Sequence, residues 1–175
     1  MKKLLSAFAA SVLLLPLTSN AENTYGGIQY AMGTYNEDGF EEVKPTALIG
    51  RFGNYVNNSV SIEGRLGVGL QDDSIDYFGI DISLELDTLI GVYGLAHANI
   101  NQNSDVHALI GFSRAEATVS ALGYSASSDD TGLSFGVGAN LGTGNNVSLN
   151  IEYVQYLNKS NFDFSALAFG AVFSF

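Results

Sequence analysis

The sequence predicts an all-β protein, an eight-stranded antiparallel up-and-down transmembrane β-barrel. Apolar residues alternate with small or polar residues through much of the chain, and this period of two is typical of strands and not of helices. Most alternating segments reach or approach the roughly 10 residues that a tilted strand needs to cross a bilayer. The last ten residues, 166–175, alternate in the same way and carry no charge.

The start of the chain has the pattern of a secretory signal peptide. Two lysines follow Met1, residues 4–17 are mostly apolar, and small residues precede a cleavage site after Ala21. The apolar segment is too short to cross a membrane as a helix. The alternative is an N-terminal helix that stays in the fold. We expect residues 1–21 to be removed on export and residues 22–175 to form a single transmembrane β-barrel domain.

The composition of the remaining chain excludes several classes of protein. Without the two leading lysines it has 5 Lys and Arg residues against 18 Asp and Glu residues, a formal net charge of −13. Such a charge argues against nucleic acid or an anionic lipid surface as a partner. The absence of cysteine leaves no disulfide framework. No later segment has the roughly 18 to 20 continuous apolar residues of a membrane helix.

The alternation places eight strands along this chain. The fourth strand changes phase near Asp87-Thr88, which predicts a bulge or bend there, or a strand that extends well past the membrane. The expected strands are 24–35, 45–53, 59–71, 78–100, 105–119, 130–142, 146–157 and 164–175.

The connections between these strands alternate in character. Residues 54–58, 101–104 and 143–146 are short and rich in the turn formers Asn and Gly. The other four connections are mostly longer, and three of them are acidic or rich in Ser. An even-stranded barrel with both ends in the periplasm needs this arrangement of three short turns and four outer loops. The four longer connections are 36–44, 72–77, 120–129 and 158–163.

The two faces of the strands differ in a way that distinguishes a membrane barrel from a soluble one. One face is continuously apolar, and the other is mostly Gly, Ala and Ser with a few charges. An eight-stranded barrel has room inside only for side chains, so small residues with a few long ones describe its interior. Buried charges persist only when they are paired. We therefore expect an internal charge network that plugs the lumen, made of Arg51, Glu63, Arg65 and Glu152. The alternative is a gated ion path.

Four segments share motifs of glycine, charged and aromatic residues: Gly111-Phe-Ser-Arg-Ala115, Phe135-Gly-Val-Gly-Ala139, Ile151-Glu-Tyr153 and Gly170-x-x-Phe173-x-Phe175. On these motifs the chain resembles the small outer-membrane β-barrels typified by the OmpA transmembrane domain and OmpX-like surface proteins. The terminal motif resembles the signal that the outer-membrane assembly machinery reads, although Ala168 stands at its polar position.

The resemblance implies the outer membrane of a Gram-negative bacterium as the location. It also implies outer-membrane lipids and lipopolysaccharide as surroundings, and the assembly machinery and periplasmic chaperones as partners during biogenesis. It does not imply one activity, because the family includes adhesins, stability proteins and barrels of unknown role.

Histidine offers the only candidate for reactive chemistry. His97 and His107 could approach each other near the turn at 101–104, which is the wrong end for the known lipid A-modifying enzymes of the outer membrane. No metal-binding spacing such as HExxH occurs. We therefore expect no catalytic, cofactor-binding or metal-binding residue, and no cofactor.

The acidic loops predict a surface role. Carboxylates in 36–42, 71–76 and 127–130 would crowd the outer rim, where divalent cations could bridge them loosely to lipopolysaccharide phosphates. The expected function is structural or surface-interactive, as a monomer with a possible extracellular protein partner. The alternatives are a small ion-conducting pore and a lipid A-modifying enzyme. Four loop residues either anchor a partner or are interfacial side chains: Ile75, Tyr77, Leu122 and Tyr124.

Overall fold

The computed structural model describes residues 23–37, 42–77, 80–101, 104–144 and 146–175, with only the backbone for 75–77 and 80–81. The predicted signal peptide, residues 1–21, lies outside this part of the chain. Among the described residues, no helix is long and apolar enough to span a membrane.

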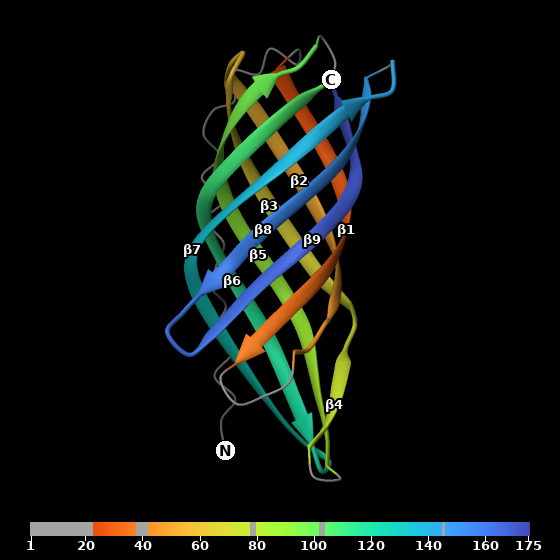
Figure 1. Cartoon of the computed structure of the whole chain (residues 1–175), viewed down its shortest axis with the longest axis vertical. Helices are drawn as coiled ribbons and strands as arrows, with labels where there is room; N and C mark the ends of the chain where they lie inside the picture. The colour runs from red at the N-terminus through yellow and green to blue at the C-terminus, as the bar shows by residue number, and fades with distance from the viewer. Residues whose placement is uncertain (1–22, 38–41, 78–79, 102–103, 145) are drawn as a thin grey trace, which may run out of the picture.

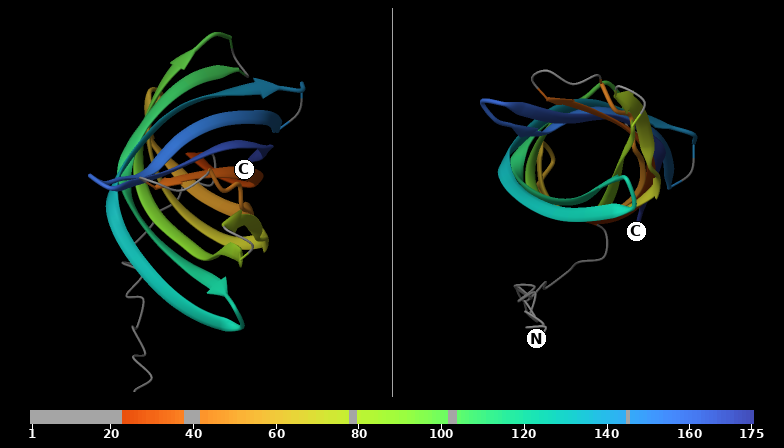
Figure 2. Two further views of the ribbon diagram at one scale, coloured as in Figure 1. Left: turned by 60° about the horizontal axis from the view of Figure 1, so that its bottom comes forward. Right: turned by 90° about the horizontal axis from the view of Figure 1, so that it is seen from below.

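The described residues form nine antiparallel strands that close into one barrel (Figures 1 and 2). β3 pairs with residues 88–96 of β5, and β4 pairs with residues 80–84 of the same strand. β3 and β4 therefore occupy one strand position of the barrel, interrupted at Asp72, and the nine strands fill eight positions. The predicted eight-stranded antiparallel barrel is therefore confirmed. The strands are β1 (Thr24–Glu37), β2 (Thr46–Asn57), β3 (Val60–Gln71), β4 (Asp73–Tyr77), β5 (Ile80–Asn99), β6 (Asp105–Ala121), β7 (Tyr124–Gly142), β8 (Val147–Asn158) and β9 (Phe162–Ser174).

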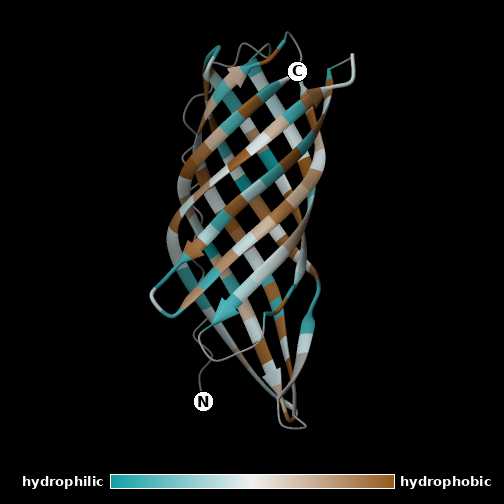
Figure 3. Ribbon diagram, in the orientation of Figure 1, coloured by the Kyte–Doolittle hydropathy of each residue, from teal (hydrophilic) through white to brown (hydrophobic). Residues whose placement is uncertain are grey.

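Large apolar side chains are exposed on the outer surface of the barrel. Figure 3 shows hydrophobic residues alternating with hydrophilic ones along the ribbons of the strands. On β6 the outward positions are apolar and exposed from Val106 to Phe112, whereas Arg114 and Glu116 occupy the next two outward positions. The alternation therefore exposes large apolar side chains outside, the reverse of a soluble barrel. The interior holds polar and charged side chains and also larger apolar ones than the sequence predicted, among them Leu89, Tyr93 and Leu95.

The two ends of the barrel differ. One end carries the start of β1, the end of β9 and the turns β2–β3, β5–β6 and β7–β8; we call it the short-turn end. At the other end, β4–β5 and β6–β7 project as long hairpins in Figure 1; we call it the hairpin end.

The strands at the hairpin end extend further than the sequence predicted. Residues 120–129, expected as a loop, are strand except for a two-residue turn at Leu122–Gly123, where both φ angles are positive (52° and 78°). The expected loop at 72–77 contains β4, and the one at 158–163 shortens to 159–161. The expected irregularity in the long fourth strand is confirmed, because the β5–β6 register shifts between Leu86 and Thr88.

Hydrogen bonds between small polar side chains hold the extended hairpin together. Ser120 and Ser125 hydroxyls lie 2.8 Å apart, and so do those of Thr118 and Ser127. Residues that favour turns and loops in isolation thus form a paired ribbon here, because tertiary pairing overrides a weak β-propensity.

Candidate functional site

Four charged side chains meet inside the barrel: Arg51 from β2, Glu63 and Arg65 from β3, and Glu152 from β8. Each occupies an inward position of its strand, and each side chain is at most 1% exposed. The structure thus brings together all four residues that the alternation placed in the interior. We call them the interior ion-pair network.

The network alternates positive and negative groups. Arg51 Nη2 lies 2.5 Å from Glu63 Oε2, and Arg65 Nε lies 2.6 Å from Glu63 Oε1. Both Nη atoms of Arg65 donate to Glu152, Nη2 at 3.0 Å, while Arg51 Nη1 lies 3.6 Å from Glu152 Oε2. Each carboxylate therefore contacts both guanidinium groups, which offsets the large cost of burying isolated charges.

The network crosses the lumen from one wall to the opposite one. Four strand-to-strand steps separate β3 from β8 in one direction, through β2, β1 and β9. The other direction, through β5, β6 and β7, also takes four steps. The Arg65–Glu152 contact therefore joins strands on opposite sides of the barrel.

Tyrosine rings fill the space around the network. The Tyr25 hydroxyl donates to Glu63 Oε2 at 2.8 Å, and the Arg65 guanidinium lies 4.7 Å from the centre of the Tyr93 ring. A Cβ atom added to Gly53 would come within 2.2 Å of the Tyr25 ring. Glycine at such inward positions leaves the room that the large side chains occupy.

A second polar group lies near the short-turn end and consists of His97 on β5 and of Asp105 and His107 on β6; we call it the histidine–aspartate cluster. His97 and His107 are directly paired across the two strands, and their ring centres lie 5.5 Å apart. Asp105 Oδ1 is 2.9 Å from His97 Nδ1 and 3.3 Å from His107 Nδ1. The predicted approach of the two histidines thus occurs, with Asp105 between them.

The remaining ring nitrogens of the cluster also have partners. His107 Nε2 lies 2.9 Å from Glu152 Oε2, which links the cluster to the interior ion-pair network. His97 Nε2 lies 2.9 Å from the Ser61 hydroxyl. Both nitrogens of His107 therefore face carboxylate oxygens, and only the imidazolium form donates to both.

Side-chain amides extend from this cluster across the short-turn end. Asn140 Nδ2 donates to Asp105 Oδ2 at 3.0 Å, and Asn150 Nδ2 donates to Asn140 Oδ1 at 2.8 Å. Gln29 Nε2 donates in turn to Asn150 Oδ1 at 2.7 Å. The chain of amides orients the Asp105 carboxylate toward the histidines.

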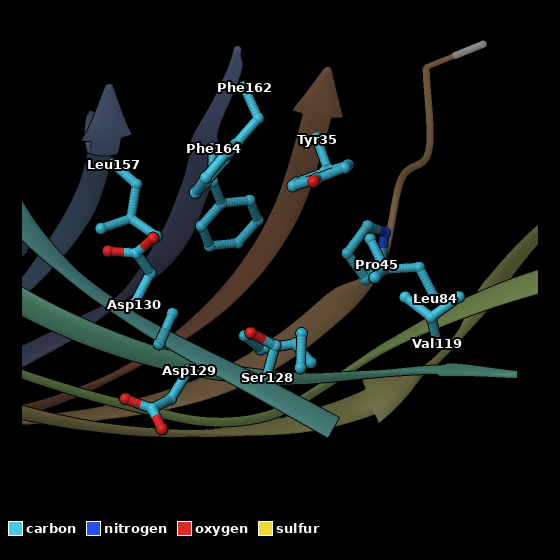
Figure 4. A pocket seen from close by; sticks show the side chains of 13 residues that line it. Tyr35, Pro45, Leu84, Val119, Ser128, Asp129, Asp130, Leu157, Phe162 and Phe164 are labelled. Carbon is cyan, nitrogen blue, oxygen red and sulfur yellow. The ribbon is translucent and has the colours of Figure 1, made fainter. Parts of the chain in front are cut away.

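A pocket of about 160 Å³ lies toward the hairpin end (Figure 4). Its wall is largely apolar, and Asp129 and Asp130 of β7 lie on one side of it. Lys159, in the turn after β8, has its Nζ 2.7 Å from Asp130 Oδ1 and so links this carboxylate of β7 to that turn. The apolar lining comprises Tyr35, Pro45, Leu84, Leu86, Ala115, Ala117, Val119, Leu157, Phe162 and Phe164.

Few cations offset the acidic residues around this end. Lys44, between β1 and β2, lies 2.8 Å from Glu42, and this hydrogen bond raises the pKa of the lysine ammonium group. Arg114 lies 3.1 Å from Asp129 on the outer surface. The cations that the structure describes at the hairpin end, Lys44, Arg114 and Lys159, are therefore already paired with carboxylates of the same chain.

The tip of the β6–β7 hairpin exposes two large side chains. Leu122 is 73% exposed and Tyr124 is 83% exposed. They lie at least nine residues beyond Phe112, or about 30 Å along the strand at 3.3 Å per residue. Whether Leu122 and Tyr124 anchor a partner or are interfacial residues stays a prediction. The side chains of Ile75 and Tyr77 lie outside the described part.

The terminal motif lies on β9 beside β1. Phe173 and the following Phe175 are exposed on the outer surface, and a Cβ atom at Gly170 would come within 2.1 Å of the Ile28 carbonyl oxygen. Glycine at this position therefore permits close pairing of β9 with β1. The role of the motif in assembly stays a prediction.

Sequence reasoning did not single out Asp105 as a member of the interior, although the expected strand 105–119 begins at this residue. The signal that could have found it is its position two residues before His107, on the same face of β6.

The closed antiparallel sheet, the apolar outer surface and the ion-paired interior define a transmembrane β-barrel. Residues 4–175 match the family described as Outer membrane protein beta-barrel domain, and the chain belongs to that family. It is thus a cell-surface protein of the outer membrane, as predicted. No curated protein sequence matches it significantly. The short-turn end is accordingly periplasmic, and the hairpin end is extracellular.

Solved structures of bacterial surface barrels share the fold. Ail, the attachment invasion locus protein of Yersinia pestis, has 21% sequence identity and a TM-score of 0.65, over 88% of this chain and 99% of Ail. Neisserial surface protein A has 16% identity and the same TM-score, over 87% of this chain and 97% of that protein. Ail is also known in complex with the heparin analogue sucrose octasulfate, a structure with 19% identity, a TM-score of 0.65 and coverage of 87% and 98%.

Proposed function

We propose that this outer-membrane barrel is a monomeric surface-interaction protein with a closed lumen, whose β6–β7 hairpin contacts an extracellular protein. The observation that carries the proposal is the change in polarity along β6. Its outward side chains are apolar up to Phe112 and charged at Arg114 and Glu116, after which the hairpin continues to an exposed tip. An apolar tip held far from the bilayer serves neither membrane insertion nor core packing, which supports a role in binding.

The chemistry of the hairpin end indicates the kind of partner. Carboxylates outnumber cations there, and the described cations Lys44, Arg114 and Lys159 are each in contact with a carboxylate. A sulfated polyanion such as the one bound to Ail would be repelled by this surface. The partner we propose is a protein with a basic surface and an apolar groove for Leu122 and Tyr124. Divalent cations would bridge the remaining carboxylates to lipopolysaccharide phosphates.

Binding by cells that display the protein tests this role. The probes are immobilised extracellular proteins of basic and of acidic isoelectric point. We expect binding to basic proteins that falls at least tenfold in the double variant Leu122→Asn, Tyr124→Ser. The matched control is Val56→Ser, an exposed apolar residue at the periplasmic end, which should bind as the unmodified protein does. Equal binding by the double variant and the control would contradict the proposal.

The closed lumen is supported by the interior ion-pair network and the tyrosines around it. In planar bilayers we expect no discrete conductance steps from the folded protein. Steps that change in Arg65→Ala protein would instead support the alternative of a small pore.

A non-enzymatic role is supported by the position of the histidines at the periplasmic end, away from the extracellular leaflet that holds lipid A. Mass spectrometry of lipid A from expressing cells should show no new species. A modified lipid A that disappears in the His107→Gln variant would overturn this part of the proposal.

A further inference from the structure

We propose that the histidine–aspartate cluster is a binding site for a divalent transition-metal ion of the zinc class. The site would lie inside the barrel at its periplasmic end. One ligand atom from each of His97, Asp105 and His107 lies within 4.8 Å of the other two. The inference is independent of the proposed surface role, because the cluster lies at the other end of the barrel.

The geometry directs three ligand atoms at one point. Both histidines present Nδ1 to the same carboxylate oxygen of Asp105, at 2.9 and 3.3 Å. Zinc–ligand bonds of about 2.0–2.2 Å in a tetrahedral arrangement place neighbouring ligand atoms about 3.3–3.6 Å apart. The cluster therefore needs movements of less than about 1.5 Å to admit an ion between its three ligand atoms.

The surroundings hold the rings in the orientation that a metal requires. Histidine ligands of metals nearly always donate their other ring N–H to a carboxylate or another oxygen acceptor. His107 Nε2 has Glu152 Oε2 at 2.9 Å, and His97 Nε2 has the Ser61 hydroxyl at 2.9 Å. Asn140 holds the Asp105 carboxylate by donating to both of its oxygens. Each proposed ligand is thus supported by a neighbour that does not compete for the ion.

Charge also favours a cation at this point. The buried ionisable residues of the described interior include two arginines and three carboxylates, those of Glu63, Glu152 and Asp105. Without a metal, an imidazolium at His107 is the counterpart of the third carboxylate, and Asp105 is the carboxylate without an arginine contact among the described ion pairs. A bound metal ion would take the place of the proton on His107 Nδ1. A metal ion coordinated by both Nδ1 atoms supplies positive charge there and leaves the contact from His107 to Glu152 in place.

The donor set selects the class of ion. Two imidazole nitrogens and one carboxylate suit Zn²⁺, Ni²⁺ or Cu²⁺, whereas Ca²⁺ and Mg²⁺ prefer an all-oxygen site. The Asp105 side chain is 12% exposed and the two histidines at most 2%, so the ion would reach the site from the periplasm past Asp105. A water molecule would complete the coordination.

Calorimetric titration of the chelator-treated, detergent-folded protein tests the proposal. We expect one Zn²⁺ per chain and no heat from Ca²⁺ at the same concentration. The variants His97→Gln and His107→Gln should each weaken Zn²⁺ binding at least tenfold. Tyr55→Phe is the matched control, because its ring lies 5.0 Å from that of His97 without offering a ligand atom. The double variant Asp129→Asn, Asp130→Asn controls for binding at the extracellular carboxylates.

Two results would overturn the proposal: no Zn²⁺ binding by the unmodified protein, or unchanged affinity in both histidine variants. Heat-modifiable gel migration shows whether each variant is folded. The Co²⁺ complex of the unmodified protein gives a second readout that needs no variant. Its visible absorption should be that of four-coordinate cobalt with nitrogen ligands, and a spectrum of hexa-aqua cobalt alone would contradict the site.

Discussion

Replacing Glu152 with glutamine removes one charge from the barrel interior while keeping the length of the side chain. In the structure, this carboxylate accepts two hydrogen bonds from Arg65 and lies 3.6 Å from Arg51 Nη1 and 2.9 Å from His107 Nε2. The variant leaves two arginines with one glutamate, Glu63, inside a wall of paired strands. Removing one partner of a buried ion pair costs about 3–5 kcal/mol.

Unfolding by urea in lipid vesicles measures this loss. With a urea dependence of about 2 kcal/mol per M, the midpoint of Glu152→Gln should fall by about 1.5–2.5 M. Glu116→Gln makes the same chemical change at an exposed, outward position and should move the midpoint by less than about 0.3 M. The double variant Arg65→Met, Glu152→Leu keeps Arg51 balanced by Glu63, so it should be more stable than Glu152→Gln.

Equal midpoints for Glu152→Gln and Glu116→Gln would refute this reasoning. Such a result would mean that the arginines keep their solvation without Glu152. The interior would then be wet enough to screen the charges, and the closed-lumen proposal would lose its physical basis.

Three further predictions concern single positions. Gly111→Ala places a Cβ atom within 2.1 Å of the Val92 carbonyl oxygen, so the free energy of unfolding in the urea titration should fall by about 1–3 kcal/mol. The control Gly94→Ala places its Cβ atom where nothing lies within 4 Å, so its free energy of unfolding should change little. Deleting Phe175 should lower the amount of protein in the outer membrane, measured by immunoblot, more than it lowers the stability of folded barrel; equal amounts would count against an assembly signal. Leu122→Asn creates an Asn-Gly turn at two positive φ angles and should slow proteolysis at the hairpin tip; faster cleavage would show that the turn is not strained by leucine.

The sequence predicted the features that depend on alternation alone. The strand faces follow from a period of two, so the inward positions of Arg51 and Glu63 could be read without any knowledge of strand pairing. Their charges stood out because most other inward positions carry uncharged side chains. The lengths of the membrane-crossing parts of the strands could also be predicted, because the alternation marks how far each strand continues.

Features that depend on pairing between distant strands could not be predicted. Asp105 joins the two histidines only because β5 and β6 pair in the register that places His97 opposite His107. This register shifts near Asp87, where the alternation of β5 also changes phase, so it could not be extended along the strand from the sequence. Metal-binding motifs read along one element miss ligands that converge across two strands. The β6–β7 hairpin was taken for a loop because Ser, Asp and Gly have weak β-propensity, and cross-strand pairing decides its structure.

The interior ion-pair network also bears on the order in which the barrel forms. Arg65 and Glu152 are 87 residues apart in the chain and lie on opposite walls. An open sheet inserted in the bilayer would hold these charges against hydrocarbon without partners, which is strongly unfavourable. Insertion of partly paired strands is therefore disfavoured, and closure of the sheet brings the charges together. The polar interior thus couples membrane insertion to ring closure in a single cooperative step, so we expect a Glu152→Gln barrel to fold into vesicles more slowly as well as to unfold more easily.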